Sequence, residues 1–235
     1  MTSELSDSLV QTWVTGWART HGYEVHHEGA VHTARLGPNS DEWEYVVFDP
    51  EETELRKVAA AVAKSPERLL TVIAEPDAGI MNTQEVNGLK LISDEEKLMV
   101  VDMATQDVED PITPEGYTTT REDFEGWTLF TVHHGDDVAA RGRMAVVDDY
   151  SILDRIYTSS DYRRQGLGTF VTRALLAMAH EHDVSEGLLV ANAEGQELYE
   201  YLGWTLLGSV HVFGAPGATD RRRPSHSQID EEISD

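Results

Sequence analysis

Residues 162–169 read Tyr-Arg-Arg-Gln-Gly-Leu-Gly-Thr, and a helical pattern of apolar residues begins at Leu167. A strand-like run over residues 150–158 precedes this stretch. Glycine adopts turns that other residues avoid and leaves backbone N–H groups uncovered. A helix N-terminus also offers unpaired N–H groups and a partial positive charge, which favour phosphate. Arg163 and Arg164 add charge at the same place. The stretch therefore predicts a strand–loop–helix unit that binds a pyrophosphate.

Three kinds of phosphate-binding loop can be compared with this stretch. A nucleoside-triphosphate loop needs Gly-x-x-x-x-Gly-Lys-Ser/Thr, and the sequence contains no such string. A dinucleotide fingerprint needs Gly or Ala at position 171, which is Val171 here. The pattern that remains is Arg/Gln-x-x-Gly-x-Gly/Ala, matched by Arg163, Gly166 and Gly168. Because this pattern is short, a second motif is needed to interpret it.

The second motif lies about one strand downstream. Residues 187–191 read as a short buried strand, and residues 192–204 as a short helix with Gly203 as its stop signal. Here the chain resembles the GNAT superfamily of N-acyltransferases, whose cofactor loop is followed by Asn-x-x-Ala-x-x-Leu-Tyr-x-x-x-Gly-Phe. The matching positions are Asn192, Leu198, Tyr199, Gly203 and Trp204, with Gly195 in the alanine position. The resemblance covers about residues 115–213 and is weak or absent over the first hundred residues.

The resemblance implies an α/β (α+β) fold, a GNAT-like mixed and mostly antiparallel sheet flanked by helices. We expect three parts: a small α+β N-terminal domain at residues 1–110, an acetyl-CoA-binding catalytic domain at 111–215, and a disordered tail at 216–235. The acidic, proline-containing residues 104–116 read as the linker. No internal sequence repeat is visible.

Patterns of apolar residues predict the individual elements. Helices are expected at 5–22 and 51–64, besides those that begin at 167 and 192. Strands are expected at 43–48, 69–74, 97–102, 117–120, 127–133, 138–147, 150–158, 187–191 and 206–213, with a hairpin turn at 135–137.

One feature departs from the family pattern. GNAT domains usually place two helices between their first two strands, where they form part of the acceptor wall. Only six residues separate Thr120 from Trp127, which is too few for two helices. We therefore expect the N-terminal domain to take over that role and to close the acceptor cleft.

The resemblance also implies the cofactor-binding residues. The pantetheine arm of acetyl-CoA would lie in the gap between two splayed strands, along the backbone of Ile156, Tyr157 and Thr158. The pyrophosphate would bind the amides of the loop, and Asn192 would bond a pantetheine amide. The residues assigned to the loop are Arg163, Arg164, Gln165, Gly166, Leu167, Gly168 and Thr169. The alternative for one of the two arginines is that it only supports the loop.

Two residues are catalytic candidates. Tyr199 matches the position of the family's general acid. A phenol with a pKa near 10 is a suitable proton donor to a departing thiolate. The alternative is that Tyr199 is an aromatic residue packed in the core. Asp154, on the strand before the loop, is a candidate general base. The alternative is that Asp154 forms an ion pair with Arg155 or Arg143. The adjacent pairs His26–His27 and His133–His134 point to opposite faces of a strand, so they predict no metal site.

Composition excludes several classes of function. The 235 residues are 40% hydrophobic, which suits a folded chain, and contain no cysteine. The net charge of −25 argues against nucleic acid as a partner. No apolar run is long enough for a membrane span, and the acidic N-terminus lacks the layout of a signal peptide, so we expect a cytoplasmic protein. The acidic surface has two readings, simple solubility or attraction of a cationic amine. A homodimer is left open.

These observations predict an N-acetyltransferase that transfers an acetyl group from acetyl-CoA to a primary amine, in a small molecule or a peptide, within a ternary complex. No metal is expected. The alternative is a non-catalytic acyl-CoA-binding or regulatory module, and a donor longer than acetyl is also left open.

Overall fold

The structure is a computed structural model that describes residues 2–76, 83–107 and 109–219. The helices among these residues are α1 (Asp7–His21), α2 (Glu52–Val62), α3 (Leu167–His180) and α4 (Ala193–Tyr201), with short 3-10 turns at Met103–Thr105 and Ser160–Tyr162. The strands are β1 (Glu24–Glu28), β2 (Val31–Arg35), β3 (Trp43–Phe48), β4 (Leu69–Ala74), β5 (Glu85–Val86), β6 (Leu89–Asp102), β7 (Thr118–Phe124), β8 (Trp127–His134), β9 (Asp137–Val147), β10 (Tyr150–Thr158), β11 (Glu186–Ala191) and β12 (Thr205–Gly214).

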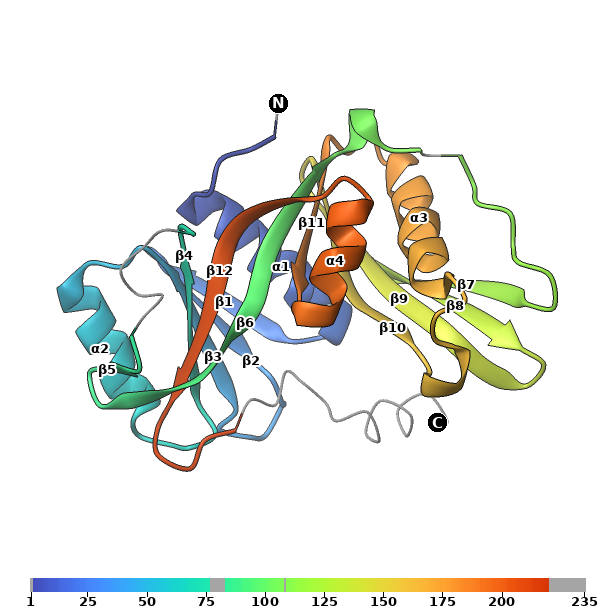
Figure 1. The fold of residues 1–235 in the computed structure, drawn as a ribbon. Helices are drawn as coiled ribbons and strands as arrows, with labels where there is room; N and C mark the ends of the chain where they lie inside the picture. The colour runs from blue at the N-terminus through green and yellow to red at the C-terminus, as the bar shows by residue number, and fades with distance from the viewer. Residues whose placement is uncertain (1, 77–82, 108, 220–235) are drawn as a thin grey trace.

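A single sheet runs through the described residues in the order β1-β2-β3-β4-β12-β6-β11-β10-β9-β8-β7, and β5 pairs with β6 beside it. Two neighbouring pairs are parallel, β3 with β4 and β10 with β11, and the other pairs are antiparallel. The predicted fold class, a mixed and mostly antiparallel sheet flanked by helices, is therefore confirmed (Figure 1).

The two halves of the chain repeat one topology. In each half an antiparallel meander leads through a crossover helix to a parallel strand: β3-α2-β4 in the first half and β10-α3-β11 in the second. The last strand of each half then lies beside the parallel strand of the other half, since β6 pairs with β11 and β12 pairs with β4. The halves therefore share their central strands, and neither half has a complete sheet without the other.

The helices cover the two faces of the sheet unequally. The α3 and α4 helices pack on one face around Met99, Val101 and Leu189, and α2 packs on the same face further along. The α1 helix packs alone on the opposite face, against Leu98, Val100 and Ile152. In Figure 1, α1 is seen behind the strands while α4 lies in front of them.

Local signals explain where α1 begins and ends. The Ser6 hydroxyl caps its N-terminus by accepting from the Leu9 amide at 3.3 Å, and Gly22 ends it with a left-handed φ of 69°. Gly16 lets the helix approach the sheet closely, because a Cβ there would lie 2.5 Å from Cγ1 of Ile152. The helix predicted at residues 5–22 is present, and it lies on the face of β9 and β10 that α3 leaves open.

The short connection before β8 is a hairpin. The β7 strand extends to Phe124, and only two residues separate it from Trp127. No helix stands between these strands, as the sequence predicted. The β1–β2 hairpin and β5 were not predicted, and the predicted tail at 216–235 lies mostly outside the described residues.

Candidate acetyl-CoA and acceptor site

The glycine loop joins β10 to α3 as predicted. Gly166 stands at the N-cap of α3 with a φ of +81°, and Arg164 is also left-handed at +63°. Within the described chain, no backbone carbonyl accepts from the N–H groups of residues 164–169. The loop therefore presents consecutive unpaired donors at a helix N-terminus, which is the physical requirement for an anion site.

The side chains of the loop divide into supporting and exposed groups. Arg163 is half-buried, and its Nε donates to the carbonyl of Thr158 at 3.3 Å, so it ties the loop to the end of β10. Gln165 is exposed, and its Oε1 accepts from the Tyr117 hydroxyl at 2.7 Å. Leu167 is buried in the core and anchors the first turn of α3, while Arg164 is exposed. Arg163 is thus the arginine that supports the loop.

Gly168 and Thr169 complete the first turn of α3. A Cβ on Gly168 would lie 3.2 Å from Cδ2 of Leu198 in α4, so a glycine here lets α3 and α4 approach at the mouth of the loop. Thr169 is half-buried beside it.

Strands β10 and β11 separate immediately before the loop. They pair only at Tyr150, Ser151 and Ile152, although β10 continues to Thr158 and β11 continues to Ala191. A bulge in β10 lies between Asp154 and Tyr157, with Arg155 at a φ of 50°. By contrast, β3 and β4 stay paired over five consecutive positions. Only the second half of the chain therefore opens a gap between its parallel strands.

The three residues assigned to the pantetheine arm lie along this gap. Tyr157 and Thr158 pair with Arg141 and Ala140 of β9, so the opposite edge of β10 faces the gap. Ile156 is half-buried and packs against the core beneath α3. These contacts fix the strand while leaving its inner edge without a β11 partner.

Asn192 caps α4 at the end of β11. Its Oδ1 accepts from the Gly195 amide at 2.8 Å, which is the usual N-cap bond. Because Oδ1 makes this bond, a hydrogen bond from the Asn192 side chain to pantetheine would have to come from its NH2 group. Gly195 has its own steric reason, because a Cβ there would lie 3.0 Å from the ring of Tyr199.

Tyr199 lies on the face of the sheet that α3 and α4 cover. It is 7% exposed, and its ring lies 5.8 Å from that of Trp204, between ring centroids. Burial first, and then the negative charge of Asp154, raise the pKa of the Tyr199 phenol well above its usual range. The phenol therefore keeps its proton at neutral pH, as a donor must.

Asp154 points to the opposite face, towards α1. Its Oδ2 lies 2.7 Å from His21 Nε2 and accepts from the Thr20 hydroxyl at 3.2 Å. Burial alone would raise the pKa of Asp154, but the hydrogen bond and charge of His21, with the charges of Arg155 and Arg143, lower it. Neither His21 nor Thr20 was a predicted site residue.

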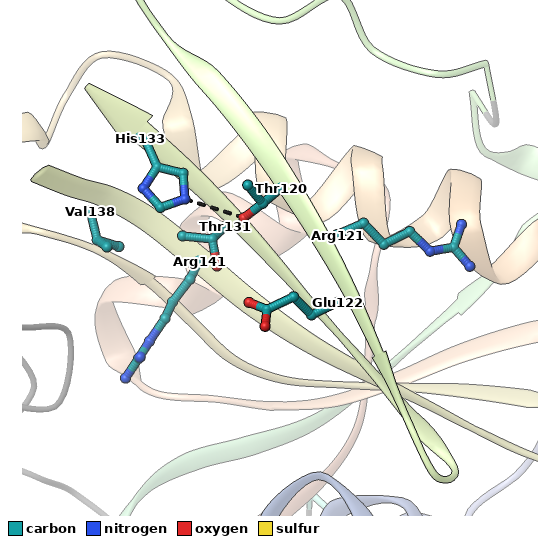
Figure 2. Close-up of a pocket in the computed structure, with 7 residues that line it drawn as sticks. All are labelled: Thr120, Arg121, Glu122, Thr131, His133, Val138 and Arg141. Atoms are coloured by element: carbon teal, nitrogen blue, oxygen red, sulfur yellow. Dashed lines mark hydrogen bonds between the residues drawn. The ribbon is translucent and has the colours of Figure 1, made fainter. Parts of the chain in front are cut away.

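A pocket of about 500 Å³ lies over β7, β8 and β9. In Figure 2 the side chains of Glu122, Thr131 and Arg141 lie on one face of the strands, and His133 bonds to Thr120. Arg141 and Arg143 are two positions apart on β9, so their side chains point to the same face of the sheet. Arg143 pairs directly with Asp154, and Arg141 lines the pocket, so the pocket lies on the same face as Asp154. It is therefore a candidate acceptor surface.

Comparison with known proteins agrees with this geometry. The sequence profile of the Acetyltransferase (GNAT) family matches residues 98–204, from the end of β6 to the start of β12. The chain carries a GNAT-family domain. This domain contains the glycine loop, the splayed strands and α4.

Solved structures share the fold of both halves. A GCN5-related N-acetyltransferase from Kribbella flavida has a TM-score of 0.67 at 15% identity, with 92% of this chain and 98% of that chain covered. A GNAT-family putative acetyltransferase from Novosphingobium aromaticivorans has a TM-score of 0.59 at 14% identity, with 88% and 96% covered.

A tandem GNAT protein from the clavulanic acid biosynthesis pathway has a TM-score of 0.55 at 14% identity, with 83% and 79% covered. No curated protein sequence matches this chain significantly. The fold similarity therefore extends over the N-terminal half, which the family profile does not reach.

None of the described helices is long and apolar enough to cross a membrane. In the same residues, no group of three or more His, Cys, Asp or Glu side chains is arranged to hold a metal ion.

Proposed function

We propose that this protein transfers an acetyl group from acetyl-CoA to a primary amine by direct attack in a ternary complex. The observation that carries the proposal is the gap between β10 and β11, which opens directly onto the unpaired amides of residues 164–169. A linear molecule with an anionic end and an amide-containing arm fits this arrangement, since the amides bind the diphosphate and the strand edge binds the arm.

The reaction needs a donor for the developing oxyanion, an acceptor for the amine proton and a proton for the leaving thiolate. We assign the donor to a backbone N–H at the β10 bulge, near Ile156 to Thr158. Tyr199 supplies the proton to the thiolate from the α4 side of the sheet. Asp154 lies on the other face, where the amine approaches, and is the carboxylate of the acceptor side. Holding both substrates across the gap accounts for much of the rate.

In this proposal the N-terminal half shapes the acceptor side, and its described crossover β3-α2-β4 lacks the features of a second cofactor site. Its crossover loop begins α2 with Glu51, Glu52 and Glu54, where α3 has Arg163, Gly166 and Gly168. Carboxylates at a helix N-terminus repel a diphosphate, and β3 and β4 do not separate. We therefore propose one acetyl-CoA site per chain.

The acceptor is a small-molecule or peptide amine in this proposal. The net charge of −25 favours a cationic amine through long-range attraction. If this attraction operates, kcat/KM for the amine falls as salt is added, and a flat response removes the electrostatic part of the proposal.

Thiol release tests the function. The chain has no cysteine, so a thiol-reactive dye reports only the CoA that is set free. Acetyl-CoA is supplied with an aliphatic diamine, an arylalkylamine or a peptide with a free N-terminus. Amine-dependent thiol release, with an acetylated product by mass spectrometry, supports transfer. Binding of acetyl-CoA without release from any amine would instead support the alternative, a non-catalytic acyl-CoA-binding module.

A further inference from the structure

The C-terminal end of α1 makes a direct contact with the strand that carries the gap. His21 and Asp154 are 133 positions apart in the chain, yet His21 Nε2 lies 2.7 Å from Asp154 Oδ2. The His21 side chain is 7% exposed and that of Asp154 is 22% exposed, so the pair is largely removed from water but not sealed. Asp154 is the last residue that pairs with β9 before the β10 bulge.

The ring of His21 is held on both sides. It stacks on Tyr23 with centroids 4.8 Å apart and an interplanar angle of 16°, and it packs beside Trp17 at 5.9 Å. The end of α1 is itself fixed to β9: Arg143 donates to the Thr20 carbonyl at 3.0 Å, and Arg19 donates to the Val146 carbonyl at 2.8 Å. These contacts hold the imidazole with Nε2 towards Asp154.

The remaining atoms of the pair are available for chemistry. Nδ1 of His21 has no hydrogen-bond partner in the described part of the chain, and it is not among the fully buried polar atoms that lack one. If Nε2 carries the hydrogen and donates to Asp154, Nδ1 has a free lone pair. The other charged or titratable groups around the pair are Arg155 of β10, Arg143 of β9, Glu44 of β3, Tyr23, and Tyr199 of α4.

We propose that His21, supplied by the N-terminal half, takes the proton of the attacking amine while Asp154 orients its ring and stabilises the imidazolium. The inference rests on the proposed function and identifies the base of that reaction. It also gives a physical reason for the two halves to share one sheet, because α1 completes a site whose other parts lie in the GNAT-family domain.

Each proton and bond is accounted for. The amine lone pair forms the C–N bond to the thioester carbonyl, and the N–H proton passes to Nδ1 of His21. The C–S bond breaks as Tyr199 gives its proton to the thiolate. Once the products leave, the imidazolium releases its proton to water and the phenolate takes one up, which restores both groups.

Asp154 alone is a weaker candidate for this role. The surroundings lower its pKa, so it takes up a proton only in acid. An imidazole ordinarily titrates near pH 6.5, close to the pH at which a general base works best. A histidine held by a carboxylate is also the arrangement by which serine hydrolases orient their base.

The kinetic test compares His21→Gln with His26→Gln. His26 is 58% exposed on β1, away from the site, and serves as the matched control. With the fastest amine of the panel above, we expect His21→Gln to lower kcat about 10²–10⁴-fold, the usual range for a general base. The rising limb of the wild-type pH profile between about pH 5 and 8 should disappear in this variant, because it reflects an imidazole. His26→Gln keeps both. Acetyl-CoA affinity, measured by calorimetry, is unchanged in both variants.

Asp154→Asn separates the two roles. We expect it to lower kcat while the rising limb is kept, because the imidazole remains. If His21→Gln retains wild-type kcat and the limb while Asp154→Asn loses activity, the carboxylate acts alone and the inference is overturned. If the wild-type protein binds acetyl-CoA and releases no thiol with any amine, the failure belongs to the proposed function, because it does not depend on a variant.

A second measurement needs neither a variant nor an amine. Nitrogen-15 NMR of the intact protein at pH 7.5 reports which ring nitrogen of His21 carries hydrogen. The expected state is hydrogen on Nε2 and a bare Nδ1. Hydrogen on Nδ1 at this pH would leave no lone pair facing the amine and would overturn the inference even if His21→Gln failed to fold.

Discussion

Gly166→Ala is the substitution that tests the loop most sharply. Gly166 has a φ of +81°, and no atom lies within 4 Å of a Cβ built on it. A methyl group therefore has space, and only the backbone conformation opposes it. An L-residue in the left-handed region costs about 1–2 kcal/mol. Two measurable quantities share this cost, the free energy of unfolding and the free energy of acetyl-CoA binding.

The division depends on whether the free loop relaxes. If the substituted alanine keeps the left-handed conformation without a ligand, the whole cost lowers the stability of the free protein. If the loop relaxes to a negative φ, stability is kept, but acetyl-CoA must restore the conformation before the amides can point at its diphosphate. The dissociation constant then rises about 5- to 30-fold, which is the equivalent of 1–2 kcal/mol. The two losses together should reach about 1–2 kcal/mol in either case.

Gly88→Ala is the matched control. Gly88 has a φ of +87°, is equally open, and lies in the turn between β5 and β6. Denaturant unfolding gives the stability of each variant, and calorimetry with acetyl-CoA gives its affinity. We expect Gly88→Ala to lose stability alone. The reasoning is refuted if Gly166→Ala changes neither quantity, or if both variants weaken acetyl-CoA binding equally.

Three further predictions concern the two faces of the sheet. Tyr199→Phe should lower kcat about 10²–10⁴-fold at unchanged acetyl-CoA affinity, since only the proton donor is removed; equal turnover would return Tyr199 to a packing role. Gly16→Ala should lower the melting temperature, because overpacking against Ile152 costs about 1–3 kcal/mol and outweighs the helix gain of about 1 kcal/mol; a higher melting temperature would contradict the close approach of α1. The lowered pKa of Asp154 predicts stability that is present above its unfolded pKa of about 3.9 and is lost as pH falls through the lower folded value. The stability difference between wild type and Asp154→Asn should therefore shrink below about pH 4 in denaturant titrations, and a constant difference would be evidence against the His21 contact.

Local patterns were sufficient where neighbouring residues decide the structure. The strands at 43–48, 69–74 and 150–158 were predicted with the bounds that the structure shows, since each is a short segment rich in β-branched, aromatic and other apolar residues. The glycine loop was predicted for the same reason: its glycines, arginines and helix start are adjacent in the chain. The roles of its residues in binding stay predictions.

Contacts between distant segments were beyond local patterns. The sequence pattern does not show that β6 lies between β11 and β12, because this position depends on pairing between strands of the two halves. The β1–β2 hairpin was missed because its residues are mostly polar and partly exposed. His21 was missed because its partner is 133 residues away; its position just before the helix stop at Gly22 was the only local signal.

Asn192 is the N-cap of α4 as well as a residue of the family motif. Asparagine before a helix is a strong N-cap signal, and its Oδ1 makes that bond to Gly195. A residue in a family motif can therefore owe its identity to the helix it starts as well as to a ligand.

Calorimetric titration of the intact protein with acetyl-CoA tests the central claim most directly. The account predicts heat at micromolar concentrations and one site per chain, lost when the diphosphate is removed, as with acetylated pantetheine at the same concentration. No heat with acetyl-CoA or CoA would contradict the assignment of the loop as the diphosphate site. Two sites per chain would contradict the proposal that the N-terminal half binds no acetyl-CoA.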